Sequence, residues 1–396
     1  MLISDRAKLI ACLNPEQRLL IAVCSDQSSP LREKAKKWFA RPFSWEHLVT
    51  LSERHKLFPI FYKNLHEDST KYYIDIPSNL KEKFAIQKQQ VLRLAVEGVR
   101  ISSVLNQEKI SSILLKGPFL SEQIYNDISL RPSRDIDILV QPEKILQVKE
   151  ILQNEGYKMI YPDFHLSRRQ TLYYESKRNQ YAFRNPENGC MVELHWRLFS
   201  QKSLFPVPTE DVFLESQEMM IAGKPIRVLS TNHSVEYLCI HGALHQWFRL
   251  LWLRDIAQIF DKKEFDYDDV LECAKPRGNE RTIEQAARLS HLFFGTQIGK
   301  SFESSSKPTK TIVNHAIGAI VSDEKFTLSH KLIRLRMPIY KMKLKRELKH
   351  KLSCWSIFQP NFNDWKKLKL PDWLFFLYFI LRPFIWFKTY YFQKGK

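Results

Sequence analysis

The chain has 396 residues, 44% of them hydrophobic and 13% aromatic, which is enough apolar surface to bury a substantial core and excludes a disordered protein. With 61 Lys and Arg against 43 Asp and Glu, its formal net charge of +18 favours phosphate-rich partners such as nucleotides, nucleic acid or an anionic membrane surface. The length indicates two or three structural units, at about 150 residues each.

The six cysteines are scattered, with no CxxC pair and no spacing typical of a zinc site. Reduced thiols in a cytoplasmic protein are the simplest interpretation. The stretch MLISDRAKLIACL has an early acid and an early lysine, so we expect no signal peptide. No window reaches the roughly 20 apolar residues of a membrane-spanning helix.

Residues 1–107 are predicted to form an N-terminal helical region. Apolar residues recur at helical spacing, as in SWEHLVTLSERHKLFPIFYKNL, and glycine is nearly absent. The segment KEKFAIQKQQVLRLAVEGVRISSVLNQ is predicted to form one long amphipathic helix.

Residues 108–230 are predicted to form a core with a mixed sheet. ISSILLKG is a short apolar run that ends in glycine, typical of a strand leading into a turn, and PFLSEQIYND follows as a short helix. RDIDILV is a second strand, PEKILQVKEILQNEGY is a helix with Pro at its start and Gly at its end, and YKMIYP is a third strand. QYAFRN and CMVELHWRLF are joined by the turn formers PENG, which predicts a hairpin. The fold class is therefore α+β, with helical regions on both sides of the core.

Residues 231–300 are predicted to be a helical region packing on this core, with VEYLCIHGALHQWFRLLWLRDIAQIF as the clearest helix pair. Residues 301–396 are predicted to be a basic C-terminal helical region. The segment SFESSSKPTK, residues 301–310, is the one candidate for a flexible joint.

Two C-terminal segments leave alternatives open. Residues 331–351, KLIRLRMPIYKMKLKRELKHK, carry nine basic residues against one Glu. They form either a solvated helix face or, with the rest of residues 331–396, a docking site for RNA or another anionic surface. Residues 373–381, WLFFLYFIL, are apolar throughout and are followed by Arg382 and Pro383. This pattern favours either a buried or docking helix or an interfacial anchor on anionic lipid.

Asp135 and Asp137 stand out within RDIDILV because charged groups are costly in a buried strand. Side chains two positions apart share a face of a strand, so we expect the two carboxylates to converge while Ile136 and Ile138 take the other face. Carboxylates this close repel each other unless a cation lies between them, and Mg²⁺ or Mn²⁺ suits such ligands together with substrate phosphates. The alternative is a pair of solvent-facing acids on an edge strand.

Glu193, His195 and Arg197 share one face of CMVELHWRL. If this strand pairs with RDIDILV, Glu193 completes a three-carboxylate cluster, which suits in-line phosphoryl or nucleotidyl transfer with two metal ions. The alternative role for Glu193 is a salt bridge to Arg197 or Arg134.

Cationic and small residues flank the acids in sequence. Lys116 and Gly117 end the preceding strand, and Arg131 and Ser133 lie just before the acids. We expect these four residues to contact nucleotide phosphates. For Arg131, the alternative is an ion pair that holds the loop.

The segments LLKGPFLSEQIYNDISLRPSRDIDILV, VELHWRL and HGALHQWFRLLWLRDIAQIF together resemble the uncharacterised nucleotidyltransferase family of the polymerase-β-like superfamily. The resemblance implies a polymerase-β-like nucleotidyltransferase core. Asp135 and Asp137 match the metal-binding pair, and Glu193 matches the third carboxylate, which holds the second metal or acts as base toward the acceptor. Lys116 and Gly117 stand where the wider superfamily usually has Gly-Ser, and Glu193 replaces the commoner Asp.

Other polar residues have alternative roles. His195 could touch the acceptor or a phosphate, Arg197 could assist from the same face, and Asp255 could contact substrate or nucleotide; a structural hydrogen bond or salt bridge is the alternative for each. His241 and His245 are four residues apart, a spacing that can chelate a metal, but without an evident third ligand we expect them to serve packing or to lie on the surface.

The leading hypothesis is a cytoplasmic, metal-dependent nucleotidyltransferase that moves an NMP group from an NTP, such as ATP, to an acceptor hydroxyl and releases pyrophosphate. The acceptor is a small molecule, an RNA or a protein side chain. The second hypothesis is a catalytically weak nucleotide-binding or partner-binding protein. The third is a basic docking protein for membrane or nucleic acid on the same fold.

Overall fold

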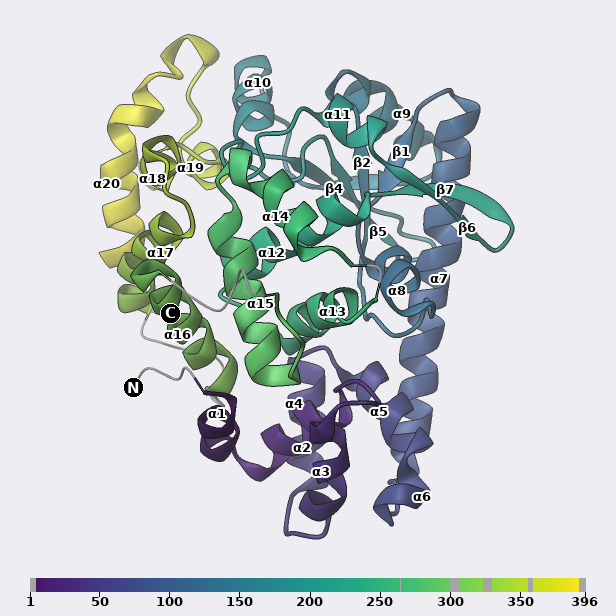
Figure 1. Cartoon of the computed structure of the whole chain (residues 1–396). Coiled ribbons are helices and arrows are strands. Elements are labelled where there is room, and N and C mark those ends of the chain that lie inside the picture. The colour runs from purple at the N-terminus through teal and green to yellow at the C-terminus, as the bar shows by residue number, and fades with distance from the viewer. Residues whose placement is uncertain (1–4, 264, 300–305, 323–329, 355–358, 392–396) are drawn as a thin grey trace.

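The computed structural model describes residues 5–263, 265–299, 306–322, 330–354 and 359–391. A seven-stranded mixed sheet lies at its centre, and helices from both ends of the chain pack around it (Figure 1). The first residues of the expected joint, 301–305, lie outside the described residues, and α16 begins at Lys307.

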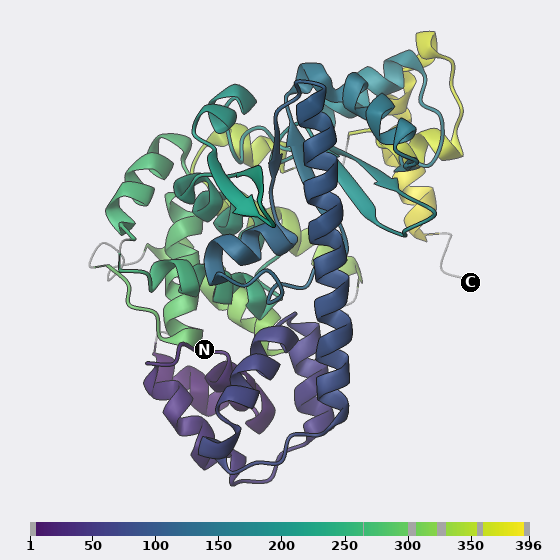
Figure 2. The ribbon, with the colours of Figure 1, turned by 90° about the vertical axis from the view of Figure 1, so that its right-hand side faces the viewer.

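The N-terminal region is helical, as predicted. Polar side chains mark where helices begin: Asn14 accepts the backbone N–H of Gln17 at 2.8 Å, and Ser44 accepts that of His47 at 3.2 Å. The long predicted helix is confirmed as α7, which runs from the N-terminal helices along the sheet (Figure 2). The helices are α1 Arg6–Cys12, α2 Pro15–Val23, α3 Pro30–Phe39, α4 Trp45–Arg54, α5 Phe58–Glu67, α6 Ser69–Tyr72 and α7 Asn79–Gln107.

The strands follow the order β3-β4-β5-β2-β1-β7-β6 across the sheet. The central strand β2 pairs in parallel with β5 and antiparallel with β1, and β4 and β5 form the predicted hairpin. The three other predicted strands are confirmed as β1, β2 and β3. The strands are β1 Ser112–Leu114, β2 Ile136–Val140, β3 Lys158–Tyr161, β4 Gln180–Arg184, β5 Met191–His195, β6 Gln217–Ile221 and β7 Lys224–Val228.

Two elements of this unit have no clear sequence signal. The edge hairpin β6–β7 has a largely exposed first strand, so it lacks the apolar run of a buried strand. Helix α10, Arg168–Lys177, has the polar sequence RRQTLYYESK and therefore lacks an apolar stripe. It begins instead at a capping box, in which Ser167 and Gln170 each bind the other's backbone N–H.

The two faces of β2 contact different parts of the core. Ile136, Ile138 and Val140 pack in the cluster that includes α7 and α9. Leu139 packs in the cluster that includes α12 and α13. Since Asp137 has the same strand parity as Leu139, its side chain points toward α12 and α13, the helix pair predicted from the sequence. The other helices of this part of the chain are α8 Gly117–Tyr125, α9 Ile145–Asn154, α11 Thr209–Leu214, α12 Thr231–Leu244, α13 Leu250–Phe260, α14 Tyr267–Ala274 and α15 Glu280–Phe294. Helix α15 packs on α12 and α13, and α14 packs on α12 and α15.

The C-terminal helices lie along one side of the molecule (Figure 1). Lys345, which follows α17, is only 1% exposed, and its Nζ donates to the carbonyl oxygens of Ser203 and Leu204. The basic segment is therefore not a uniformly solvated face, because one of its lysines anchors it to the core; the side chains of residues 331–336 lie outside the described part. These helices are α16 Lys307–Val321, α17 His330–Leu344, α18 Leu348–Ser353, α19 Phe362–Lys367 and α20 Leu377–Tyr391, with the 3-10 turn η5 Asp372–Leu374 before α20.

No helix in the described ranges is long and apolar enough to cross a membrane. All six cysteines lie in those ranges, and none forms a disulfide.

Gly98 sets how closely α7 approaches the sheet. A Cβ at this position would lie 2.5 Å from Cζ of the buried Phe119 and 3.3 Å from Ile136. We expect Gly98→Ala to lower the free energy of unfolding by about 1–3 kcal/mol, because overpacking outweighs the better helix propensity of alanine. Urea denaturation measures this change.

The matched control is Gly318→Ala in α16, where a Cβ meets nothing within 4 Å. Here the helix propensity of alanine acts alone, so the free energy of unfolding should rise by up to about 1 kcal/mol. Equal effects at the two positions would contradict the close contact between α7 and α8.

Candidate active site

The pairing of β2 with β5 brings two carboxylates together. Asp137 stands directly opposite Glu193 in the parallel register. Neighbouring strands are about 4.8 Å apart, so facing side chains on one side of a sheet are close neighbours. The predicted adjacency of the two strands is confirmed, and within it Glu193 faces Asp137 rather than Asp135.

His195 contacts both carboxylates. Its Nε2 lies 3.1 Å from Asp137 Oδ1 and 3.5 Å from Glu193 Oε2. Burial would lower the pKa of His195, but its bonds to the two carboxylates outweigh burial and raise that pKa. One ligand atom from each of the three residues lies within 4.8 Å of the other two, and no other His, Cys, Asp or Glu group in the described ranges has this geometry.

A partly buried amide orients His195. Asn179 Nδ2 lies 3.2 Å from His195 Nδ1 and 3.3 Å from two backbone carbonyls after β5, while its Oδ1 accepts a hydrogen bond from Ser200 Oγ at 2.7 Å. Because Asn179 presents an N–H to Nδ1, the imidazole proton belongs on Nε2, toward the carboxylates. His195 therefore donates to the acids in this arrangement. Asn179 lies outside the motifs, and nothing in the sequence singles it out.

Lys116 places a positive charge beside Asp137. Its Nζ lies 3.4 Å from Asp137 Oδ1 and 5.4 Å from the ring centre of Tyr237 on α12. Burial would lower the pKa of Lys116, but the charge of Asp137 and then Tyr237 raise it above its ordinary value. Burial likewise would raise the pKa of Asp137, and Lys116 and His195 instead hold it well below the usual range. Asp137 is therefore a charged carboxylate although it is buried.

Asp135 lies at the start of this strand segment and is half-buried. Its Oδ1 accepts a hydrogen bond from Ser133 Oγ at 3.2 Å, and its carbonyl oxygen accepts one at 3.0 Å. Burial and then the charges of Asp137 and Glu193 raise the pKa of Asp135. Asp135 thus lies within the field of the other two acids, although it is not part of the compact group formed with His195.

Gly117 allows α8 to begin close to this loop. Its φ is +60°, in the left-handed region, and a Cβ there would lie 3.1 Å from both Cβ and Oγ of Ser133. The structure therefore brings the predicted phosphate contacts Lys116, Gly117 and Ser133 next to the acids.

Arg131 has a buried partner. Its Nε lies 3.1 Å from Asp255 Oδ2 on α13, and Tyr125 donates to Asp255 Oδ1 at 2.8 Å. Burial would lower the pKa of Arg131, but Asp255 raises it. Asp137 also raises the pKa of Arg131, which shows that the guanidinium lies within the field of the acids. This ion pair joins the loop before β2 to α13.

Basic residues from separate parts of the chain gather near Asp135. His55 Nδ1 and its carbonyl oxygen accept the first two backbone N–H groups of α13, at 3.3 and 3.2 Å, which places Lys56 near Arg249. Burial and then the charges of Arg134 and Arg249 lower the pKa of Lys56, and the nearby charge of Asp135 raises it by less. Arg134 likewise contributes to lowering the pKa of Arg249.

These three residues form a cationic rim, defined here as Lys56, Arg134 and Arg249. Arg134 is the first residue of the RDIDILV motif, whereas Lys56 and Arg249 lie in the turns before α5 and α13. Only the packing of the N-terminal helices against α13 could reveal that Lys56 and Arg249 lie near Arg134, and Lys56 near Asp135.

His241 serves packing, whereas His245, one turn further along, is exposed at the surface. Their ring centres are 4.7 Å apart, and they lie 5.2 and 5.4 Å from the ring of Trp252. Burial and then the positive charge of Lys116 lower the pKa of His241 well below its ordinary value. The rings are therefore neutral, and His241 lines the same side of the sheet as the acids.

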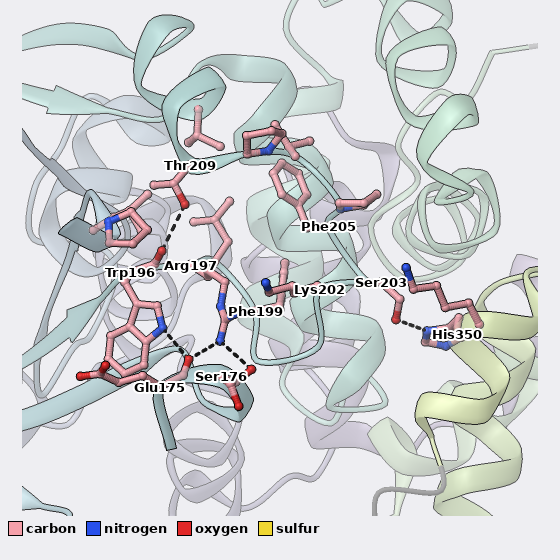
Figure 3. Close-up of a pocket in the computed structure, with 18 of the residues that line it drawn as sticks. Glu175, Ser176, Trp196, Arg197, Phe199, Lys202, Ser203, Phe205, Thr209 and His350 are labelled. Carbon is pink, nitrogen blue, oxygen red and sulfur yellow. Dashed lines mark hydrogen bonds between the residues drawn. The ribbon is translucent and has the colours of Figure 1, made fainter. Parts of the chain in front are cut away.

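Arg197 is turned away from the acids. Its Nη2 donates to the carbonyl oxygens of Glu175 at 2.8 Å, of Ser176 at 3.3 Å and of Arg178, so it satisfies the C-terminal end of α10 (Figure 3). Burial lowers the pKa of Arg197. Glu193 pairs with His195 instead.

A cavity of about 790 Å³ opens beyond His195. Leu139, which pairs with His195 in the sheet register, contributes to its wall. In Figure 3, Lys202 lies between the wall of Trp196 and Arg197 and the opposite wall, where Ser203 contacts His350 at 3.4 Å. The lining includes aromatic and basic side chains, namely Trp196, Phe199, Phe205, Lys202, Lys345 and Lys349, together with the acids Glu175 and Glu347.

Comparison with known families identifies one match. Residues 41–295 match a family model described as an uncharacterised nucleotidyltransferase. The match begins within the N-terminal helices and includes Lys56, so it extends beyond the motif-bearing segment, and it ends before α16. No curated protein matches the chain.

We expect loss of the buried Arg131–Asp255 ion pair to lower the stability of the protein strongly. Asp255 is fully buried, so Asp255→Asn leaves the Arg131 guanidinium buried without its counter-ion. We expect the free energy of unfolding in urea to fall by about 3–5 kcal/mol.

Glu218→Gln is the matched control. It removes an ion pair with Arg227 of similar length, 3.3 Å, in which both side chains are exposed. We expect a change of about 0.5 kcal/mol or less. If the two variants unfold at the same urea concentration, the buried pair does not stabilise the fold.

Proposed function

Because the chain belongs to the uncharacterised nucleotidyltransferase family, we propose that it transfers an NMP group from an NTP to an acceptor hydroxyl and releases pyrophosphate. The observation that carries the proposal is the direct pairing of Asp137 with Glu193, with His195 and Lys116 bonded to the same carboxylate. A fold that places a buried acid opposite a partly buried one, at an electrostatic cost, is consistent with a functional role for the pair.

The donor set suits a divalent cation. Hard carboxylate oxygens are the ligands that Mg²⁺ and Mn²⁺ prefer, and the raised pKa of Asp135 reflects burial and negative charge that a cation would offset. Asp137 and Glu193 would hold the ion, with Asp135 as the further carboxylate. When bound, the ion supplies charge neutralisation and polarisation of the phosphoryl group that is transferred. His195 keeps both ligands oriented by donating its Nε2 proton to them.

The residues around the acids would bind the triphosphate. Lys116 is charged and Ser133 carries a hydroxyl beside Asp135, while Gly117 allows the start of α8 to approach closely. The ion pair with Asp255 holds the Arg131 guanidinium within the electrostatic field of Asp137. The cationic rim would extend this positive surface toward the solvent-exposed end of the nucleotide phosphates.

The reaction needs one proton acceptor. The acceptor oxygen bonds to the α-phosphorus, the bond from that phosphorus to pyrophosphate breaks, and the hydroxyl proton passes to a carboxylate. Glu193 suits this role better than Asp137, because its side chain is 24% exposed whereas that of Asp137 is 4% exposed and bonded to Lys116.

The cavity beyond His195 is the proposed acceptor pocket. Its volume of about 790 Å³ falls within the range of small-molecule sites. Its aromatic lining suits an acceptor with an apolar part, and its basic side chains, which outnumber the acids Glu175 and Glu347, suit an anionic group. A protein side chain or an RNA end could also reach it from the open side.

The central experiment measures label transfer. Purified protein is incubated with each α-labelled NTP, Mg²⁺ and a cell extract. We expect transfer to fall by about a thousandfold or more in Asp135→Asn/Asp137→Asn, because the variant lacks the carboxylates that position the cation and phosphates. Electron paramagnetic resonance of Mn²⁺ should show weaker binding in the same variant, independently of any acceptor.

Asp163→Asn is the control, since Asp163 is an exposed acid that pairs with Lys366 far from this sheet position. It should keep full transfer and full Mn²⁺ binding. Transfer that survives in the double variant would refute the assignment of the acids. NTP binding without transfer to any component of the extract would favour the weakly catalytic nucleotide-binding protein.

The cationic rim gives a second test. We expect Lys56→Met/Arg249→Met to raise the KM for NTP by about tenfold or more, because two charged phosphate contacts are lost, while the acids that act in the chemical step stay in place. Lys81→Met, at an exposed site at the start of α7, controls for the loss of positive charge and should leave KM unchanged. An unchanged KM in the rim variant would place the triphosphate elsewhere.

A further inference from the structure

The start of α20 and the turn before it expose a group of large apolar side chains. Their exposed fractions range from 45% to 71%, and they lie within twelve consecutive residues. From Phe376 onward they recur at helical spacing and share one side of the helix. We call this group the apolar patch; it consists of Trp373, Phe376, Phe379, Ile380 and Phe384.

The opposite side of the same segment is buried. Phe375 is 6% exposed and Tyr378 is fully buried. The ring of Phe375 lies 5.3 Å from Tyr173 on α10 and 6.0 Å from Trp365 on α19, and Tyr378 donates to the carbonyl oxygen of Leu368 at 2.6 Å. These contacts hold α20 to the protein, and of the apolar patch Phe379 adds a contact to them, with 5.7 Å between its ring centre and that of Tyr173. A surface helix with apolar side chains on both sides is expected to contact a second apolar environment besides the protein core.

Exposed basic side chains lie on the segments next to the apolar patch. Ser167 at the start of α10 bonds to Asp372 in η5, and the ring of Tyr173 on α10 lies 6.0 Å from that of Trp365 on α19, so α10 and α19 both adjoin the segment that carries the patch. Arg169 lies over the ring of Phe375, with 6.0 Å between the guanidinium carbon and the ring centre. The exposed cations of these segments are Arg168, Arg169, Lys177, Lys366, Lys367 and Lys369.

The acidic residues near the apolar patch form hydrogen bonds or ion pairs within the protein. Asp372 accepts from Ser167 and from the backbone N–H of Arg169, Asp364 binds Arg382 at 2.5 Å, and Asp163 binds Lys366. The cations next to the apolar patch outnumber these three acids, so the electrostatic field around the patch is positive.

The position of the patch agrees with a docking role. Helix α20 lies at the outer edge of the molecule in both views (Figures 1 and 2). It also lies beyond residue 295, where the family match ends. The patch thus lies outside the matched residues, where a large surface can approach it.

We propose that the apolar patch docks on an anionic membrane surface. The aromatic side chains enter the boundary between headgroups and acyl chains, and the surrounding lysines and arginines bind lipid phosphates. Aromatic residues beside Lys and Arg are the composition that interfacial helices use for this purpose. The inference does not depend on the proposed catalytic activity.

Charge favours lipid over the other occupants of such a patch. A second copy of the chain carries the same net charge of +18, so pairing of two patches would bring their neighbouring cations together and cause repulsion. RNA would use the cations and stack bases on the aromatic rings, but it would leave the aliphatic Ile380 in water. An anionic bilayer satisfies the cations and all five apolar side chains.

Vesicle co-sedimentation of the full chain tests the proposal. We expect binding to vesicles of phosphatidylglycerol and phosphatidylcholine, weak binding to phosphatidylcholine alone, and loss of affinity as salt increases. Trp373→Ser/Phe376→Ser/Phe384→Ser should weaken binding by about tenfold or more.

The matched control removes three apolar side chains of similar exposure that lie apart from one another, Val96→Ser/Leu214→Ser/Met220→Ser, and should bind as the unaltered chain does. A second measurement guards against misfolding: brominated lipids should quench tryptophan fluorescence in the unaltered chain, and Trp373→Phe should bind equally while showing less quenching.

Three outcomes would overturn the proposal. The first is equal binding of the patch variant and the control variant to anionic vesicles. The second is a change in molecular mass by light scattering in the patch variant with no change in vesicle binding, which would identify a second copy as the occupant. The third is RNA binding that depends on the apolar patch in the absence of vesicle binding.

Discussion

The structure depends on the neutralisation of two acids that face each other on neighbouring strands. Asp137 and Glu193 pair directly because β2 and β5 are parallel and in this register, and two carboxylates about 5 Å apart in a partly buried site repel each other by a few kcal/mol. His195 from β5 and Lys116 from the turn after β1 supply the compensating contacts, and Asn179 fixes the ring that makes one of them. The same charge balance makes the site suitable for a divalent cation and a triphosphate.

A second, buried ion pair connects this site to the surrounding helices. Arg131 and Asp255 join the loop before β2 to α13, and the start of α13 binds His55 after α4. These contacts place Lys56 near Asp135 and Arg249 near Lys56 and Arg134. The family match includes both segments, and the proposed nucleotide site draws on the sheet and on the helices on either side of it. Lys56, Arg134 and Arg249 form no ion pair with the described residues, a state that favours an anionic ligand.

The C-terminal helices combine anchoring with exposure. Lys345 is buried and bonded to backbone carbonyls, and Phe375 and Tyr378 pack against α10 and α19. The wall of the cavity beyond His195 includes Lys345 and His350 from this region. The same region that encloses the proposed acceptor pocket therefore carries the apolar patch, so membrane docking and acceptor binding would take place on one side of the chain.

Local patterning in the sequence determined much of the architecture: the long helix α7, the strands β1 to β3, the β4–β5 hairpin and the pair α12–α13 each have a periodicity or a turn signal of their own. The acids Asp135, Asp137 and Glu193 were identifiable because charge within an apolar strand is costly. Register, in contrast, is a property of two strands together, so only the tertiary structure placed Glu193 opposite Asp137. It also decided that Arg131 is paired within the protein and that Lys56 is a neighbour of the acids. Those contacts join residues far apart in the chain, and no local pattern encodes which distant surfaces pack together.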